Sequence, residues 1–237
     1  MTKGSRSERR CCGKGERSSA LALPQVQRVL DVVETDSGSV YLVLERLPAS
    51  TLDGFIWDDR LDEDMAIDIS RQLARILIHL HARGVVHRDL RNGAIHVAEE
   101  GGRFVVKLTS FVIATIAGEP RLTPRGMPIG HPAWVAPEQL RGEESDPRSD
   151  LFALGVVLFT MLAGRLPFDE ARASAEPRHL PLRPKSHAAS LDGICLKLLS
   201  SDPQARYQNA EALLAALEEI APSSRHAAGP AKSLEAS

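Results

Sequence analysis

The sequence has few of the features that mark secreted, membrane-spanning or nucleic-acid-binding proteins. It contains only three cysteines, two of them adjacent, which excludes a disulfide framework and favours a reducing, cytoplasmic location. The longest apolar run, 151–163, is shorter than the roughly 20 residues that a membrane span needs, so we expect no span. The 29 basic and 31 acidic residues nearly cancel, so no net field attracts nucleic acid.

The rest of the composition is that of a soluble globular protein. Apolar residues make up 43% of the 237 positions and charged residues 25%, which is enough to build a core. Residues 1–24 begin with a basic stretch of Gly, Ser, Lys and Arg, and residues 222–237 are also poor in apolar side chains. Such segments bury too little surface to offset the entropy of ordering, so we expect two disordered tails around one domain, 25–221.

Two β-rich runs open this domain and a long amphipathic segment follows. Residues Val29–Val33 and Val40–Leu44 flank a turn that contains Gly38, and this pattern predicts a β-hairpin. From Asp62 the apolar period changes to that of a helix of about five turns, which Gly84 ends. The residues that share the predicted apolar face are Ala66, Ile69, Leu73, Ile76, Leu77 and Leu80.

The second half of the chain is mainly helical. Short strands are predicted near Ala94–Val97 and Phe104–Leu108, followed by helices at 151–163, Leu191–Leu199 and Ala210–Ile220. Cys195 falls in an apolar helical run and is expected to be a buried thiol. Because the strands come first and the helices follow, the pattern indicates an α+β fold.

Four motifs occur in a fixed order along this pattern. They are His87-Arg88-Asp89-Leu90, Ala136-Pro137-Glu138, the run from Ser149-Asp150 to Gly155, and Asp202-Pro203-Gln204-Ala205-Arg206-Tyr207. Together they resemble the protein kinase family, in particular its bacterial Ser/Thr members, over about residues 25–220. The resemblance implies a protein kinase-like fold with an N-lobe remnant at 25–47 and a mostly helical C-lobe at 48–221.

The resemblance also assigns roles to individual residues. Asp89 matches the proton acceptor for a substrate hydroxyl, and the hinge that would meet adenine matches Glu45, Arg46 and Leu47. The remaining matched positions are structural ones: the stacked pair His87 and Phe111, Arg88 in the catalytic loop, Asp150 bracing that loop, and the buried ion pair of Glu138 with Arg206.

The chain departs from the family pattern where magnesium would bind. Ser110 stands in place of the aspartate of the Asp-Phe-Gly motif, and Ala94 stands in place of the asparagine of the catalytic loop. Two further replacements are Arg91 for a lysine and His131 for a threonine. The Gly-rich loop, the phosphate-binding lysine and its glutamate partner would need roughly 60 residues ahead of the hairpin. Only about 24 precede it, which predicts a truncated N-lobe.

These departures predict a pseudokinase that acts by protein binding, with no cofactor, no metal site and Asp89 retained as a structural carboxylate. The expected partner is a protein or a second copy, through the hairpin edge 40–44, the activation segment 110–138 or the loop 169–188. The alternative is a Ser/Thr protein kinase, truncated at its N-terminus or with residual binding of ATP and Mg²⁺. Truncation alone does not explain Ser110 and Ala94, which lie inside the C-lobe.

Overall fold

The computed structural model describes residues 23–48, 50–57, 61–100, 103–117, 130–168 and 188–220. The predicted tails, apart from Leu23 and Pro24, lie outside these residues, as do nearly all of the loop 169–188 and residues 118–129 of the activation segment. The strands are β1 (Val29–Glu34), β2 (Val40–Leu44), β3 (Val85–Val86), β4 (Ile95–Glu100), β5 (Arg103–Leu108) and β6 (Thr115–Ile116). The helices are α2 (Leu52–Trp57), α3 (Glu63–His81), α4 (Pro137–Leu140), α5 (Pro147–Ala163), α6 (Ala188–Leu198) and α7 (Ala210–Glu218).

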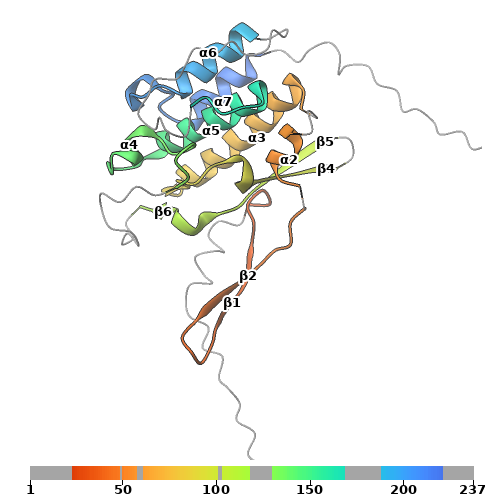
Figure 1. Ribbon diagram of the computed structural model, residues 1–237, viewed down its shortest axis with the longest axis vertical. Helices are drawn as coiled ribbons and strands as arrows, with labels where there is room; N and C mark the ends of the chain where they lie inside the picture. The colour runs from red at the N-terminus through yellow and green to blue at the C-terminus, as the bar shows by residue number, and fades with distance from the viewer. Residues whose placement is uncertain are drawn as a thin grey trace, which may run out of the picture.

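Helix α3 is the centre of the helical body (Figure 1) and contacts α5, α7 and β5. It begins where the Asp62 carboxylate accepts the Met65 amide at 2.8 Å, which satisfies one of the free N–H groups of the first turn. The six residues predicted to share its apolar face are all buried, which confirms the helix read from the period. The predicted α+β class is likewise confirmed.

Helix α5 runs through the core and is buried on all sides from Ser149 to Met161. It begins four residues before the predicted start because the Asp146 side chain caps the Arg148 amide and Pro147 occupies the first turn. It ends at Gly164, whose φ of 67° is the left-handed conformation that favours glycine. None of the helices in the described ranges has the length and hydrophobicity to span a membrane.

Two short antiparallel sheets support the loops between α3 and α5. Strands β4 and β5 pair from Ile95 opposite Leu108 to Glu100 opposite Arg103, and β3 pairs with β6. Val26 is buried and forms a bridge with Leu108 of β5, and the half-buried Leu23 packs against the same core. The sequence predicted that the tail ends at residue 24 and that the N-lobe remnant starts at residue 25. This boundary lies between Leu23 and Val26, which both pack on the core.

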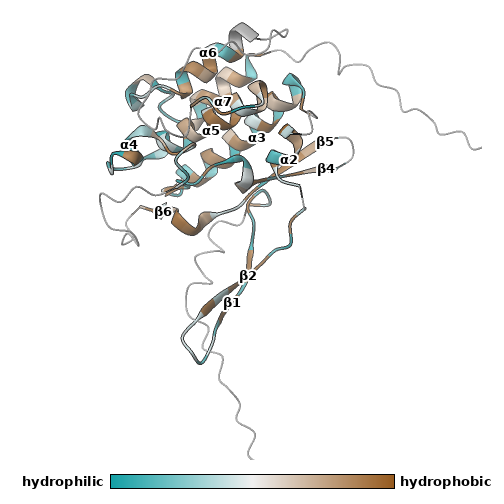
Figure 2. Ribbon diagram, viewed as in Figure 1, coloured by the Kyte–Doolittle hydropathy of each residue, from teal (hydrophilic) through white to brown (hydrophobic). Residues whose placement is uncertain are grey.

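The β1–β2 hairpin extends away from the helical body (Figure 1) and forms a two-stranded sheet. Its strands lie where the sequence predicted them, with a bulge at Leu30. Figure 2 shows hydrophobic stretches along the strands of the hairpin, which lies outside the core, and a hydrophilic turn. Large hydrophobic side chains exposed on it are Leu30, Val33, Val40, Tyr41, Leu42, Val43 and Leu44.

The contact between α5 and α6 yields a stability prediction. A Cβ added at Gly155 would lie 2.6 Å from Leu198 Cβ, so α6 would have to shift. We expect Gly155→Ala to destabilise the protein by about 1–3 kcal/mol, the usual cost of overpacking. Gly193→Ala in α6 meets nothing within 4 Å and should stabilise by about 0.5–1 kcal/mol through helix propensity. Urea unfolding of both variants checks the pair, and equal effects would contradict the close packing.

Candidate functional site

The catalytic-loop segment His87–Asp89 is fixed by one buried carboxylate. Asp150, 1% exposed, accepts the His87 and Arg88 amides, each at 2.9 Å, and His81 Nε2 lies 2.9 Å from its Oδ2. These contacts hold Arg88 at a φ of 68°, a conformation that a non-glycine residue adopts only under constraint. The structure therefore places Asp150 as the brace of this loop. The contribution of His81, the last residue of α3, was not foreseen from the motifs.

His87 joins this loop to the segment that follows β5. Burial lowers the pKa of His87, so the ring is neutral near pH 7. A neutral ring with the proton on Nε2 fits both contacts: Nε2 donates to the Thr109 carbonyl at 2.8 Å, and the Asp89 amide donates to Nδ1 at 3.2 Å. The ring also meets Phe111 edge to face, with centroids 4.6 Å apart.

Ser110 and Asp89, which these contacts bring together, form a direct hydrogen bond. Ser110 Oγ donates to Asp89 Oδ2 at 2.8 Å, and Arg91 Nε lies 3.5 Å from Asp89 Oδ1. Ser110 has φ 69° and ψ 49°, a left-handed conformation that orients its side chain toward the loop. Ala94 is fully buried, and its carbonyl accepts the Thr109 amide at 2.9 Å. Asp89 is thus satisfied by a hydroxyl and a nearby guanidinium.

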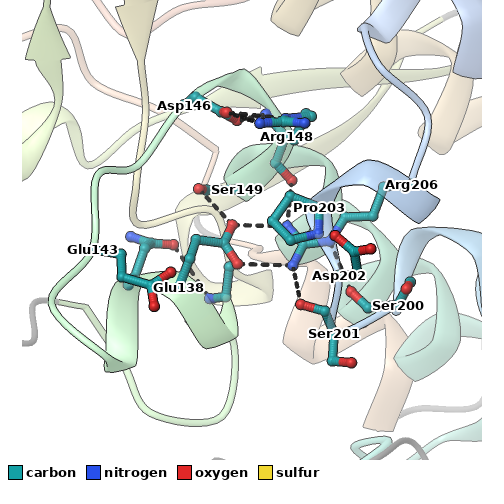
Figure 3. Close-up of polar contacts among 12 residues, drawn as sticks. Glu138, Glu143, Asp146, Arg148, Ser149, Ser200, Ser201, Asp202, Pro203 and Arg206 are labelled. Carbon is teal, nitrogen blue, oxygen red and sulfur yellow. Dashed lines mark hydrogen bonds and ion pairs between the residues drawn. The ribbon is translucent and has the colours of Figure 1, made fainter.

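Glu138 and Arg206 form a buried bidentate ion pair (Figure 3). Two nitrogens of the guanidinium donate to the two carboxylate oxygens, each at 2.8 Å, and both side chains are at most 5% exposed. Ser149 Oγ donates to the same carboxylate at 2.8 Å. The carbonyls of Ser200 and Arg148 accept further bonds from Arg206. The pair ties α4, where the activation segment ends, to the turn before α7.

The ionisation of Glu138 follows from this contact. Burial alone would raise the pKa of Glu138, but the hydrogen bonds and the positive charge of Arg206 outweigh burial and hold the pKa below its ordinary value. Glu138 therefore stays charged at neutral pH, which keeps the pair intact.

The predicted hinge lies where the hairpin meets the body. The Glu45 carboxylate contacts Lys107 and Arg28, and the hydrogen bond from Lys107 is the largest cause of its lowered pKa. Gln27 Nε2 donates to the Glu45 carbonyl at 2.9 Å, so this acceptor already has a partner within the chain. The other two predicted hinge residues follow β2: Arg46 is exposed and Leu47 is half-buried. No motif in the sequence indicated the role of Gln27.

Comparison with known proteins matches residues 16–231 to the family model of the protein kinase domain. The chain belongs to the protein kinase family. Relatives include the serine/threonine-protein kinase PrkC of Bacillus subtilis, 32% identical over 86% of this chain and 32% of that protein. A probable serine/threonine-protein kinase of Clostridium perfringens, CPE1738, is 33% identical over 84% of this chain and 30% of that protein. The chain spans about a third of the length of these relatives.

Kinases of this family use ATP and magnesium, and the residues found here do not fit the metal. The position of the principal carboxylate ligand holds Ser110, whose hydroxyl donates to Asp89 and is a weak ligand for a hard dication. The second position holds Ala94, which has no ligand atom in its side chain. Among the described residues, no group of three His, Cys, Asp or Glu side chains is placed to hold a metal ion.

The Glu138–Arg206 geometry predicts a large, non-additive effect of mutation. Glu138→Ala leaves a buried guanidinium without its carboxylate and should lower the free energy of unfolding by about 3–5 kcal/mol. Arg206→Ala should cost a similar amount, and the double variant should cost clearly less than the sum. Chemical denaturation of the four proteins measures the coupling.

The exposed pair Arg75–Glu218, with N–O distance 2.8 Å, is the matched control. Glu218→Ala should change stability by less than about 1 kcal/mol, because solvent screens exposed pairs. Additive losses at Glu138 and Arg206 would contradict a direct interaction between them.

Proposed function

We propose that this kinase-family chain is a pseudokinase, which acts by binding another protein and not by phosphoryl transfer. The observation that carries the proposal is the hydrogen bond from Ser110 to Asp89. With an aspartate at position 110, two carboxylates would face each other, and their repulsion would favour a bound cation or a proton between them. A serine donates a hydrogen bond instead, so the site is electrostatically balanced without a metal ion.

The replacement of Ala94 supports the same conclusion. Phosphoryl transfer depends on charge neutralisation by metal ions that bridge the phosphates. Both protein positions that hold them in the family lack a suitable ligand, and both lie well inside the chain. The proposal therefore does not depend on which residues precede the hairpin.

The scaffold around the site favours a binding role. The Asp150 contacts, the His87–Phe111 stack and the Glu138–Arg206 pair are all intact, so the loop and the end of the activation segment keep a defined shape. A domain that lacks the metal ligands but keeps these structural contacts is suited to present a defined surface to a protein partner. The two surfaces that we propose are the activation segment 110–138 and the hairpin edge 40–44.

Ser/Thr protein kinase activity is the second candidate. Asp89 remains at the proton-acceptor position, and the relatives are described as serine/threonine-protein kinases. This reading requires metal ligands other than residues 94 and 110. Arg91, which lies beside Asp89, supplies positive charge but cannot replace a metal ion that bridges two phosphates.

Replacing Ser110 by the aspartate of the family tests whether the site of this chain is stable without a metal ion. Ser110→Asp replaces a hydrogen bond to Asp89 by repulsion, so we expect it to destabilise the protein by about 1–3 kcal/mol in chelator. Millimolar Mg²⁺ should recover part of the lost stability of Ser110→Asp. It should recover more in the double variant that also carries Ala94→Asn. Thermal unfolding with and without Mg²⁺ measures both effects.

Ser110→Asn is the matched control, because it has nearly the shape of aspartate without the charge. Neither this variant nor the wild type should respond to Mg²⁺. A wild-type protein that is itself stabilised by Mg²⁺ would contradict the proposal. So would a Ser110→Asp variant that is as stable in chelator as Ser110→Asn.

A further inference from the structure

The two edges of the β1–β2 hairpin differ in chemistry. Strand β1 carries Asp31 and Glu34, whereas β2 reads Val-Tyr-Leu-Val-Leu and has no charged residue. Charged side chains on an edge strand discourage pairing with another chain, and an uncharged apolar edge permits it. The hairpin is therefore protected on one edge and unprotected on the other.

Backbone contacts strengthen this asymmetry on the β1 side. The Val32 amide, which faces away from β2, donates to the Asp31 Oδ1 atom at 2.8 Å. That N–H is thus already satisfied by the neighbouring side chain and is not offered to another strand. Charged side chains and this local hydrogen bond therefore both disfavour pairing of another strand with the β1 edge, which we call the closed edge.

The direction of the β2 backbone groups follows from two hydrogen bonds at its ends. The Ser39 carbonyl accepts the Thr35 amide at 2.9 Å, and the Glu45 amide donates to the Arg28 carbonyl at 2.9 Å. Residues 39 and 45 therefore face β1, and the alternation along a strand places 41 and 43 on the same side. The N–H and C=O groups of Val40, Leu42 and Leu44 face the open edge, where the described residues supply no strand.

We propose that two copies of this chain associate through β2, edge to edge and antiparallel, to form a four-stranded sheet. Two strands alone are marginally stable in water, and three or more with an apolar face are the usual minimum. Pairing two hairpins meets that minimum. It also brings the exposed apolar side chains of the two β2 strands into cross-strand contact with each other.

The strand is complementary to itself in one register. With Leu42 opposite Leu42 of the second copy, Val40 lies opposite Leu44, and all three outward-facing residues exchange hydrogen bonds with their partners. Tyr41 then lies opposite Val43, so every cross-strand pair is apolar. A slip of two residues in either direction would place a turn residue or Arg46 opposite a strand residue, so this register is preferred.

The shape of the chain allows this pairing. The hairpin extends away from the helical body (Figure 1). In an antiparallel pair the body of the second copy lies beyond the tip of the first hairpin, so the two bodies lie at opposite ends of the sheet. The same register places Arg46 near the turn of the second copy, which contains Asp36, and this contact is electrostatically favourable.

Residues 1–22 contain a single residue of the β-branched or aromatic types that strands favour, Thr2, and residues 221–237 contain none, so neither segment favours a strand. The contact between the two β2 strands is small beside the roughly 800 Å² that each partner buries in a standard interface, so we expect association in the micromolar range.

The test uses the full chain and a matched pair of variants. Val32 and Leu42 lie directly opposite each other in the hairpin, and each points its amide away from the other strand. Leu42→Pro removes an outward N–H from the open edge, and Val32→Pro removes one from the closed edge. Analytical ultracentrifugation across about 1–200 μM should show dimerisation of the wild type and of Val32→Pro. Leu42→Pro should weaken it at least about tenfold.

A second pair of variants, with cysteine in place of proline, tests the proposal even if proline unfolds the hairpin. Leu42→Cys places two thiols opposite each other across the two-fold axis, with an expected Cα separation of about 5.5 Å that a disulfide can bridge. Mild oxidation should give a covalent dimer for Leu42→Cys and no more than the wild-type amount for Val32→Cys. A wild type that stays monomeric at all concentrations would overturn the proposal. Equal crosslinking of the two cysteine variants would also overturn it.

Discussion

The hydrogen bonds that Asp150 accepts are the constraint on which the rest of the site depends. The carboxylate is buried at the start of α5, the most buried of the described helices, so its position is set by the core. It fixes the backbone at His87 and Arg88, and that backbone in turn places Asp89 and the His87 ring. Because a buried carboxylate without partners is very costly, this loop cannot relax independently of the core.

The contacts around this loop are compatible with either a serine or an aspartate at position 110, and the residue at this position determines the charge of the site. The frame places residue 110 opposite Asp89, and in this chain that residue donates a hydrogen bond. A carboxylate at this position would repel Asp89 and would favour a cation or a proton between the two groups. The hydroxyl removes that repulsion while the surrounding contacts stay intact.

The sequence predicts the elements whose signals are local. The period of α3 and the alternation around Gly38 are local patterns, and they predict the helix and the hairpin. The Glu138–Arg206 pair joins residues 68 positions apart, and it was expected only from the resemblance to the kinase family. Helix α2 and the early start of α5 were missed, because a short helix has little periodicity and a cap acts through one side chain. The contact of Gln27 with Glu45 joins residues 18 positions apart, and only the folded chain shows it.

The most direct test of the central claim is equilibrium binding of ATP to the wild-type chain, by calorimetry, with and without Mg²⁺. The hinge acceptor at Glu45 has a partner in Gln27 and the metal positions hold Ser110 and Ala94. We therefore predict millimolar or weaker affinity that Mg²⁺ does not improve. Micromolar binding that requires Mg²⁺ would show that the metal site is functional and would contradict the assignment as a pseudokinase.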